Sequence, residues 1–180
     1  MVQKIFMKQQ EIERVFLVKQ LPADFNNNKK LIIRAGNFYD SNVVDSLRIR
    51  QIGDKYELTK KEGESTRERT EHIIYISKNE FEVIWPAARW KYEKDRYLCP
   101  VNNHTAELDI YHGRLKGYAR VEVEFSNQQQ AREFNPPDWF GEEITDFNNE
   151  IHSDIGKITF SDFQQRYKEK GIDLKPISVQ

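Results

Sequence analysis

The sequence predicts an α+β protein in which a predominantly antiparallel sheet is accompanied by short helices. Three observations predict this class. Successive segments alternate apolar and polar residues with a period of two, which is typical of strands with one solvated face. Gly53-Asp54 separates two such segments and is a hairpin turn signal. Helical patterns are confined to short stretches that begin at cap residues and end at proline or glycine.

The composition fits one folded domain, which we expect to span residues 1–180. The 28 Lys and Arg residues nearly balance the 29 Asp and Glu residues, so we expect neither nucleic acid nor a membrane surface as a partner. No apolar run approaches the roughly 20 residues of a membrane-spanning helix, and no signal peptide is visible. The single cysteine, Cys99, fits a reducing compartment and a structural thiol. We therefore expect a cytoplasmic protein.

The first expected strand, Glu11–Val18, places two carboxylates side by side. Because side chains alternate across a strand, Glu11, Glu13 and Val15 share one face. Neighbouring carboxylates repel each other, and a hydrated cation such as Mg²⁺, which prefers carboxylate oxygens, relieves the repulsion. The pattern is also that of an ordinary solvated strand face.

The other strands follow from the same alternation. A short strand at 31–34 is expected to break near Gly36 and Asn37, and the hairpin at Gly53-Asp54 joins the next two strands. The remaining strands are expected at 46–51, 56–61, 70–76, 90–98, 106–111 and 120–125.

The four histidines lack metal-ligand spacing, so we expect them at the surface or in turns.

Three short helices are expected from their caps and stops. Ser77 followed by Glu80 has the spacing of a capping box, and Pro86 ends the helix that it starts. The other two are a helix at 128–134 capped by Ser126 and a C-terminal helical tail of about 158–170 stopped by Gly171.

Charges on the polar strand faces are sorted by sign. A merely solvated face predicts mixed signs. An alternative is a barrel with a polar lumen, in which acidic pairs on one wall bind a divalent metal and basic pairs on the other bind a polyanion. Both interpretations are open at this point. The acidic pairs are Glu11/Glu13, Glu107/Asp109 and Glu122/Glu124, and the basic pairs are Arg48/Arg50 and Lys94/Arg96, with Lys61 in addition.

At these residues the sequence resembles the CYTH superfamily, the triphosphate tunnel metalloenzymes. Glu11–Val18 is similar to the family's signature Glu-x-Glu-x-Lys strand, and the later pairs match in order over residues 10–147. The resemblance implies an eight-stranded antiparallel tunnel-like β-barrel with short helices packed outside. It also implies Mg²⁺ or Mn²⁺ as cofactor and hydrolysis of a triphosphate, either inorganic tripolyphosphate or a nucleoside triphosphate.

The resemblance also assigns roles to individual residues. The implied metal ligands are Glu11, Glu13, Glu122 and Glu124, with Asp109 close by. The implied phosphate-binding residues are Arg48, Arg50, Lys61, Lys94 and Arg96, with Lys60 as the alternative to Lys61. Beyond the resemblance, our working hypothesis is that a second metal ion, or a carboxylate such as Glu71 or Glu107, positions and activates water.

Two departures from the family pattern leave alternatives open. Val15 stands at the signature lysine, and the loss of one charge-assisted contact costs about 1.5–3 kcal/mol, roughly 10- to 150-fold in rate or binding. The match also fades beyond Asp146. The alternatives are a class IV-type adenylate cyclase and a catalytically weakened polyphosphate- or nucleotide-binding protein. The sequence leaves open whether the protein forms a homodimer.

Overall fold

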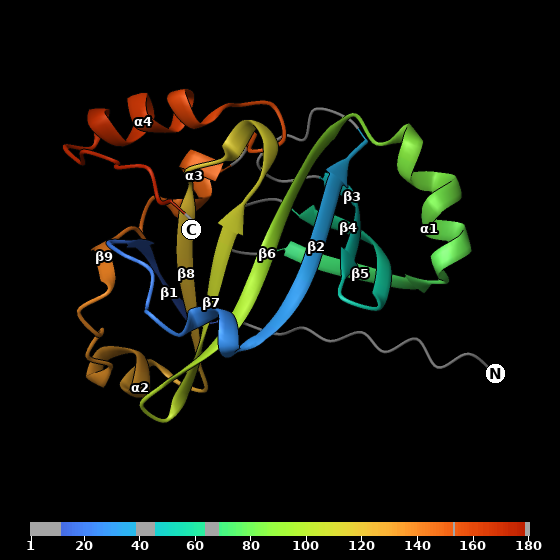
Figure 1. Ribbon diagram of the computed structural model, residues 1–180. Coiled ribbons are helices and arrows are strands. Elements are labelled where there is room, and N and C mark those ends of the chain that lie inside the picture. Colours follow the sequence, from blue (N-terminus) through green and yellow to red (C-terminus); the bar gives the residue numbers. More distant parts are fainter. Residues whose placement is uncertain (1–11, 39–45, 64–68, 153, 179–180) are drawn as a thin grey trace. The chain divides into compact units, whose positions relative to one another are not determined.

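The computed structural model describes residues 12–38, 46–63, 69–152 and 154–178 (Figure 1). Side chains are not described at 61–71 or at Asn149. Two compact units emerge. Among the described residues, unit 1 contains Ile33–Lys91, and unit 2 combines residues 12–32 with those from Tyr92 onward.

Unit 1 is an antiparallel sheet in the order β5-β4-β3-β2. The predicted hairpin is confirmed, because Ile52 pairs with Lys55 across a two-residue loop whose Gly53 has a φ of 57°. The capping box of α1 (Lys78–Ile84) is also confirmed, and a 3₁₀ turn, η2 (Trp85–Ala87), follows it. The strands are β2 (Lys29–Asn37), β3 (Ser46–Ile52), β4 (Lys55–Gly63) and β5 (Arg69–Ile76).

Helix α1 covers one face of this sheet, and arginines lie on the other. Ile49 of β3 and Phe81 of α1 are both fully buried in one apolar cluster. Arg48 and Arg50 flank Ile49 and therefore lie on the opposite face of β3. The predicted division between an apolar face under a helix and a polar face is confirmed for this unit.

Strand β2 is longer than the expected 31–34, but it ends at Asn37, within the break expected near Gly36 and Asn37. Gly36 itself still belongs to the strand, since it pairs with Ile49. A Cβ atom at this position would lie 2.9 Å from Cβ of Ala88 and 3.3 Å from the ring of Trp85. Glycine is needed here for a close approach to the segment after α1, not for a turn.

Unit 2 contains the antiparallel order β6-β7-β8-β1-β9. The last of these strands was not expected, and it pairs with β1 through Phe16 and Val18. With it, the described residues form nine strands instead of the eight implied by the family resemblance. The bounds are β6 (Trp90–Val101), β7 (His104–Tyr111), β8 (Ala119–Phe125), β1 (Ile12–Val18) and β9 (Phe140–Glu143), with 3₁₀ turns η1 (Phe25–Asn27) and η3 (Gly113–Leu115).

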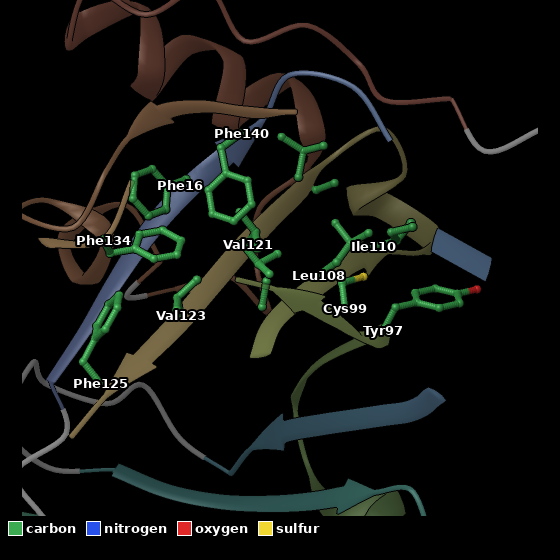
Figure 2. Packing of buried hydrophobic residues seen from close by; sticks show 14 of the residues in the cluster. Phe16, Tyr97, Cys99, Leu108, Ile110, Val121, Val123, Phe125, Phe134 and Phe140 are labelled. Atoms are coloured by element: carbon green, nitrogen blue, oxygen red, sulfur yellow. The ribbon is translucent and has the colours of Figure 1, made fainter. Parts of the chain in front are cut away.

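One face of the unit 2 sheet packs against α2 (Gln128–Glu133) in a core of aromatic and branched side chains (Figure 2). Phe16 and Phe134 lie in this core with Cys99, whose burial raises the thiol pKa to about 11. Cys99 is therefore a buried structural thiol, as expected. The cap of α2 is Asn127, one residue after the predicted Ser126, since the Asn127 side chain accepts from the backbone of Gln130.

The C-terminal segment covers part of the other face of the same sheet. Its helices are α3 (Asn148–His152) and α4 (Phe160–Glu169), and Phe163 and Tyr167 of α4 pack beside Val15 and Leu17 of β1. The predicted stop at Gly171 is confirmed by its φ of 79°. No helix in the described part of the chain is long and apolar enough to cross a membrane.

Candidate active site

The strand register of unit 2 brings charged residues from four strands onto one face. Directly opposed residues of antiparallel strands lie on the same face. Arg96 of β6 opposes Asp109 of β7, and Glu107 of β7 opposes Glu122 of β8. At the other side of β8, Glu124 opposes Glu13 of β1.

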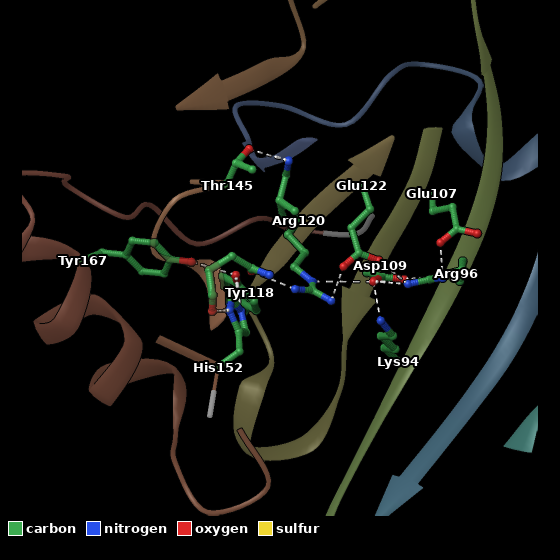
Figure 3. Close-up of polar contacts among 12 residues, drawn as sticks. Lys94, Arg96, Glu107, Asp109, Tyr118, Arg120, Glu122, Thr145, His152 and Tyr167 are labelled. Atoms are coloured by element: carbon green, nitrogen blue, oxygen red, sulfur yellow. Dashed lines mark hydrogen bonds and ion pairs between the residues drawn. The ribbon is translucent and has the colours of Figure 1, made fainter. Parts of the chain in front are cut away.

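Asp109 lies at the centre of this face and is fully buried. Arg96 donates to it in a bidentate manner, from Nε to Oδ1 at 2.7 Å and from Nη2 to Oδ2 at 2.8 Å, and Lys94 Nζ donates to Oδ2 (Figure 3). Burial alone would raise the pKa of Asp109, but the nearby cations outweigh it and hold that pKa well below its usual range. Burial lowers the pKa of Lys94 to about 8, against the opposing attraction of Asp109.

Two glutamates complete the contacts of Arg96. Its Nη2 donates to Glu122 Oε2 at 2.6 Å, and its Nη1 donates to Glu107. Burial raises the pKa of Glu107, and the neighbouring carboxylates Glu122 and Asp109 add to the rise, while Arg96 opposes it. Glu107 is the most exposed of these partners, with a side chain 25% exposed.

The expectation that acidic and basic pairs occupy separate walls is wrong for Lys94 and Arg96. Both cations lie on β6 and form ion pairs with carboxylates of β7, and Arg96 also reaches β8. Buried charges require close partners, so the nearest carboxylates neutralise the cations directly.

Arg120 is a functional candidate that the sequence reasoning missed. It opposes Asp109 across β7 and β8, and its Nη2 lies 2.5 Å from Glu122 Oε1. The signal was present in the sequence, because Arg120 has the same strand parity as Glu122 and Glu124.

Val15 lies on the same face of the sheet as the charged residues, but it packs in the apolar cluster beside them. It opposes Glu122 and is 1% exposed, packed with Ile144 and the C-terminal segment. Its backbone is also fixed from that segment, since its N–H donates to Thr145 Oγ1 at 3.0 Å and its carbonyl accepts from Ile144. An apolar residue at this position therefore has a packing role under the C-terminal cover.

In unit 1, Arg50 is oriented by a residue that the sequence reasoning also missed. Glu57, which opposes Arg50, is 4% exposed and accepts from Arg50 Nε at 2.8 Å. Thr59 donates to the same oxygen at 3.3 Å. Arg48, the other member of the predicted basic pair, lies on the same face of β3 as Arg50 and opposes Thr59 of β4.

The side chains of three predicted site residues are not described. Glu11 lies wholly outside the described residues. Lys61 and Glu71 are described only through their backbone, which places them opposite each other in the pairing of β4 and β5. The alternative lysine, Lys60, pairs with His72 in the same ladder and therefore lies on the opposite face.

The carboxylate face has the ligand chemistry of a hard divalent cation, since its acidic residues offer only oxygen donors. Among the described residues, however, no three potential ligands lie close enough together to hold a metal ion. Glu122 and Asp109 contact arginines. Beside them, Glu13 and Glu124 form a directly opposed pair of carboxylate residues, whose oxygen donors are of the type that a divalent ion prefers.

Comparison with known proteins places the whole arrangement in a family. Residues 9–158 match the model of the CYTH domain. The chain belongs to the CYTH family. This confirms the resemblance inferred from the ordered charge pairs.

Relatives and solved structures of this CYTH chain agree on the fold. It is 39% identical over 140 residues, 76% of this chain and 89% of the relative, to an inorganic triphosphatase of Nitrosomonas europaea. It is 28% identical over 158 residues, 86% of this chain and 98% of the relative, to an inorganic triphosphatase of Acetivibrio thermocellus. A crystal structure of an inorganic triphosphatase matches with a TM-score of 0.65 and 33% identity, over 82% of this chain and 95% of that chain. The predicted fold class, an antiparallel sheet with short helices, is confirmed.

Proposed function

We propose that this CYTH protein is an enzyme that hydrolyses a triphosphate, inorganic tripolyphosphate or a nucleoside triphosphate, with a divalent cation. The observation that carries the proposal is the charged face of unit 2, where buried carboxylates hold Lys94 and Arg96 beside further glutamates. The names of the two relatives support this substrate class. We further propose a cytoplasmic location, which fits the balanced charge and the single buried thiol.

Arg96 is the proposed centre of phosphate binding. Its planar guanidinium suits bidentate contacts with phosphate oxygens. Asp109 is fully buried behind Nε and Nη2, whereas Nη1 points to the more exposed Glu107. A phosphate group would therefore replace Glu107 at Nη1, while Asp109 keeps the guanidinium in place. Lys94 adds positive charge beside it.

Glu107 is the proposed residue that positions the attacking water. Its pKa is already raised by burial, and Arg96 is the neighbour that opposes the rise. When phosphate takes the place of Glu107 on Arg96, the carboxylate loses that partner and becomes a stronger base. Glu71 is the alternative candidate for the same task.

A divalent cation held by Glu13 and Glu124 together with Glu11 would neutralise the triphosphate and polarise a phosphoryl oxygen. Glu122 was expected as a further ligand, but its two oxygens face Arg96 and Arg120, so the ion would have to displace one of these arginines. Mg²⁺ and Mn²⁺ are the proposed ions, since both accept carboxylate ligands. Asp109 was expected as a further ligand, but its burial and its contacts with Arg96 favour the role of a counter-ion. The phosphate-binding roles of Arg48, Arg50 and Lys61 are proposed from the resemblance alone.

A phosphate-release panel tests the proposed function. Tripolyphosphate, ATP and thiamine triphosphate are each supplied with Mg²⁺ or Mn²⁺, and cyclic AMP is measured in the ATP samples. We expect phosphate release that stops when the metal is chelated. Cyclic AMP as the product would support the cyclase instead, and a metal-dependent thermal shift with tripolyphosphate but no release would support a binding protein.

Replacing Glu13 with Gln should abolish phosphate release and leave the circular dichroism spectrum unchanged, because the substitution removes a carboxylate charge from the proposed cation site. Glu133→Gln is the matched control, since it makes the same chemical change on the exposed surface of α2. Turnover by Glu13→Gln equal to that of the control would exclude Glu13 from the reaction.

A further inference from the structure

Arg120 is a third cation of the charged face, and none of the roles above uses it. Its side chain is 12% exposed and has three polar neighbours. Nη2 lies 2.5 Å from Glu122 Oε1, Nε lies 3.7 Å from Asp109 Oδ2, and Nη1 donates to Asn148 Oδ1 at 2.9 Å. Arg120 therefore contacts two carboxylates of the face and one residue of the C-terminal segment (Figure 3).

The two carboxylates that contact Arg120 are the ones that hold Arg96. Glu122 gives one oxygen to each arginine, Oε2 to Arg96 and Oε1 to Arg120. Asp109 accepts two hydrogen bonds from Arg96 and lies close to Arg120 on its Oδ2 side. Arg120 thus fixes Glu122 directly, from the side opposite to Arg96, so the Glu122 oxygens cannot turn without breaking an ion pair. It acts on Asp109 only through the longer ion pair, because its buried Nε has no hydrogen-bond partner among the described residues.

Arg120 also balances the charge of the ion-paired cluster at the centre of the face. In this cluster Arg120, Lys94 and Arg96 carry three positive charges, and Glu107, Asp109 and Glu122 carry three negative charges. Without Arg120 the cluster would have one net negative charge in a poorly solvated environment, beside the further carboxylates Glu13 and Glu124. Such a charge repels a polyanion such as a triphosphate.

Asn148 completes the arrangement from α3. It is 5% exposed, and its side-chain oxygen accepts from Arg120 while its backbone carbonyl accepts from His152 Nδ1 at 2.8 Å. The neutral side-chain amide of Asn148 thus holds Nη1 of the Arg120 guanidinium without adding another negative charge. The orientation of Arg120 therefore depends on the C-terminal segment.

We propose that Arg120, held by Asn148, is a positioning residue of the triphosphate site. It keeps Glu122 and Asp109 charged and oriented, and these in turn present Arg96 and Lys94 to the substrate. The inference rests on the proposed function, because it assigns Arg120 to the binding of that substrate.

The test compares two substitutions of Arg120 with a matched control. Arg120→Met should raise the KM for tripolyphosphate about 10- to 100-fold, with a smaller change in kcat. Arg120→Lys restores the charge but not the three-sided contact, so it should recover part of the loss. Asn148→Ala should raise KM only a few-fold, because it leaves the charge in place.

Arg166→Met is the control. Arg166 also fixes the C-terminal segment, through Ile151 O at 2.9 Å and Asp154 at 2.6 Å, but it has no contact with the charged face. It should lower the melting temperature and leave KM unchanged. A purely structural Arg120 would behave in the same way as this control.

Calorimetric titration of each variant with tripolyphosphate separates this inference from the proposed function. A wild-type protein that binds tripolyphosphate without hydrolysing it would overturn the function, and the dissociation constants would still decide the role of Arg120. Unchanged KM and dissociation constant in Arg120→Met would overturn the positioning role. If Arg120→Met fails to fold, unchanged values in both Arg120→Lys and Asn148→Ala would overturn it, and absence of binding by the wild type would overturn both proposals.

Discussion

Asp109 shows at the level of a single residue how this protein keeps a buried charge. The carboxylate is fully buried, and it is stabilised because Lys94, Arg96 and Arg120 surround it. A buried ion pair gains little over an apolar pair, but removing one partner leaves an uncompensated charge. The stability of the face therefore depends on Asp109 more than on its half-buried neighbour Glu107.

Asp109→Asn should lower the free energy of unfolding by about 3–5 kcal/mol, because it leaves buried cations without their main counter-ion. Urea denaturation of the purified protein measures this loss. Asp138→Asn is the control, since Asp138 is exposed and its substitution should change stability by less than about 0.5 kcal/mol. A loss in Asp109→Asn as small as in the control would contradict the counter-ion role.

At the level of elements, strand β2 and helix α1 are fitted to each other through Gly36. The segment after α1 approaches the strand so closely that a Cβ atom at position 36 would contact Ala88 at 2.9 Å and Lys91 at 3.2 Å. The Ala88 atom belongs to a short, buried side chain that cannot rotate away. This close packing allows Phe81 and Ile49 to be fully buried.

Gly36→Ala should therefore destabilise the protein by about 1–3 kcal/mol, the usual cost of overpacking. Thermal unfolding followed by circular dichroism measures the change. The double substitution Gly36→Ala with Ala88→Gly removes the clashing methyl group and should recover part of the loss. An unchanged melting temperature in the single variant would show that the segment after α1 moves freely.

At the level of the whole molecule, the C-terminal helices join the sheet of unit 2 through a directed chain of hydrogen bonds. His152 Nδ1 must donate to the carbonyl of Asn148, so Nε2 of the neutral ring accepts from Tyr118 at 2.7 Å. Tyr118 then accepts from the hydroxyl of Tyr167 at 2.9 Å. His152 was expected at the surface or in a turn, and this prediction is wrong because α3 packs it against Tyr118 and Phe163.

The neutral state of His152 predicts how stability depends on pH. Burial lowers its pKa well below 6.5, and Arg120 adds to the effect, while the hydrogen bond to Asn148 opposes it. Below pH 6.5 the unfolded chain therefore binds a proton that the folded protein does not bind. Acidification then favours unfolding, by up to about 1.4 kcal/mol for each pH unit below 6.5.

Urea denaturation at pH 7.5, 6.5 and 5.5 measures this dependence in the wild type and in His152→Gln. The variant should lose the part of the slope that belongs to His152. The other histidines are present in both proteins, so their contribution cancels in the difference. Identical slopes would show that His152 is protonated in the folded protein as readily as in the unfolded chain.

The sequence alone determined eight of the nine described strands, the hairpin at Gly53-Asp54 and the polar parity of residues such as Glu13 and Arg96. These features are local, because alternation and turn chemistry depend on residues a few positions apart. The ordered charge pairs were also sufficient for the family, which the CYTH match confirms.

Only the tertiary structure decided which charges neutralise each other and which residues they enclose. The pairing of β6 with β7 and of β7 with β8 brought Arg96 and Arg120 to the same carboxylates. The cover by α3 and α4 buried Val15 and packed His152 against Tyr118 and Phe163. Strand parity gives the face of a side chain but neither its neighbouring strand nor its cover. Those depend on packing between segments far apart in the chain, and so does the site.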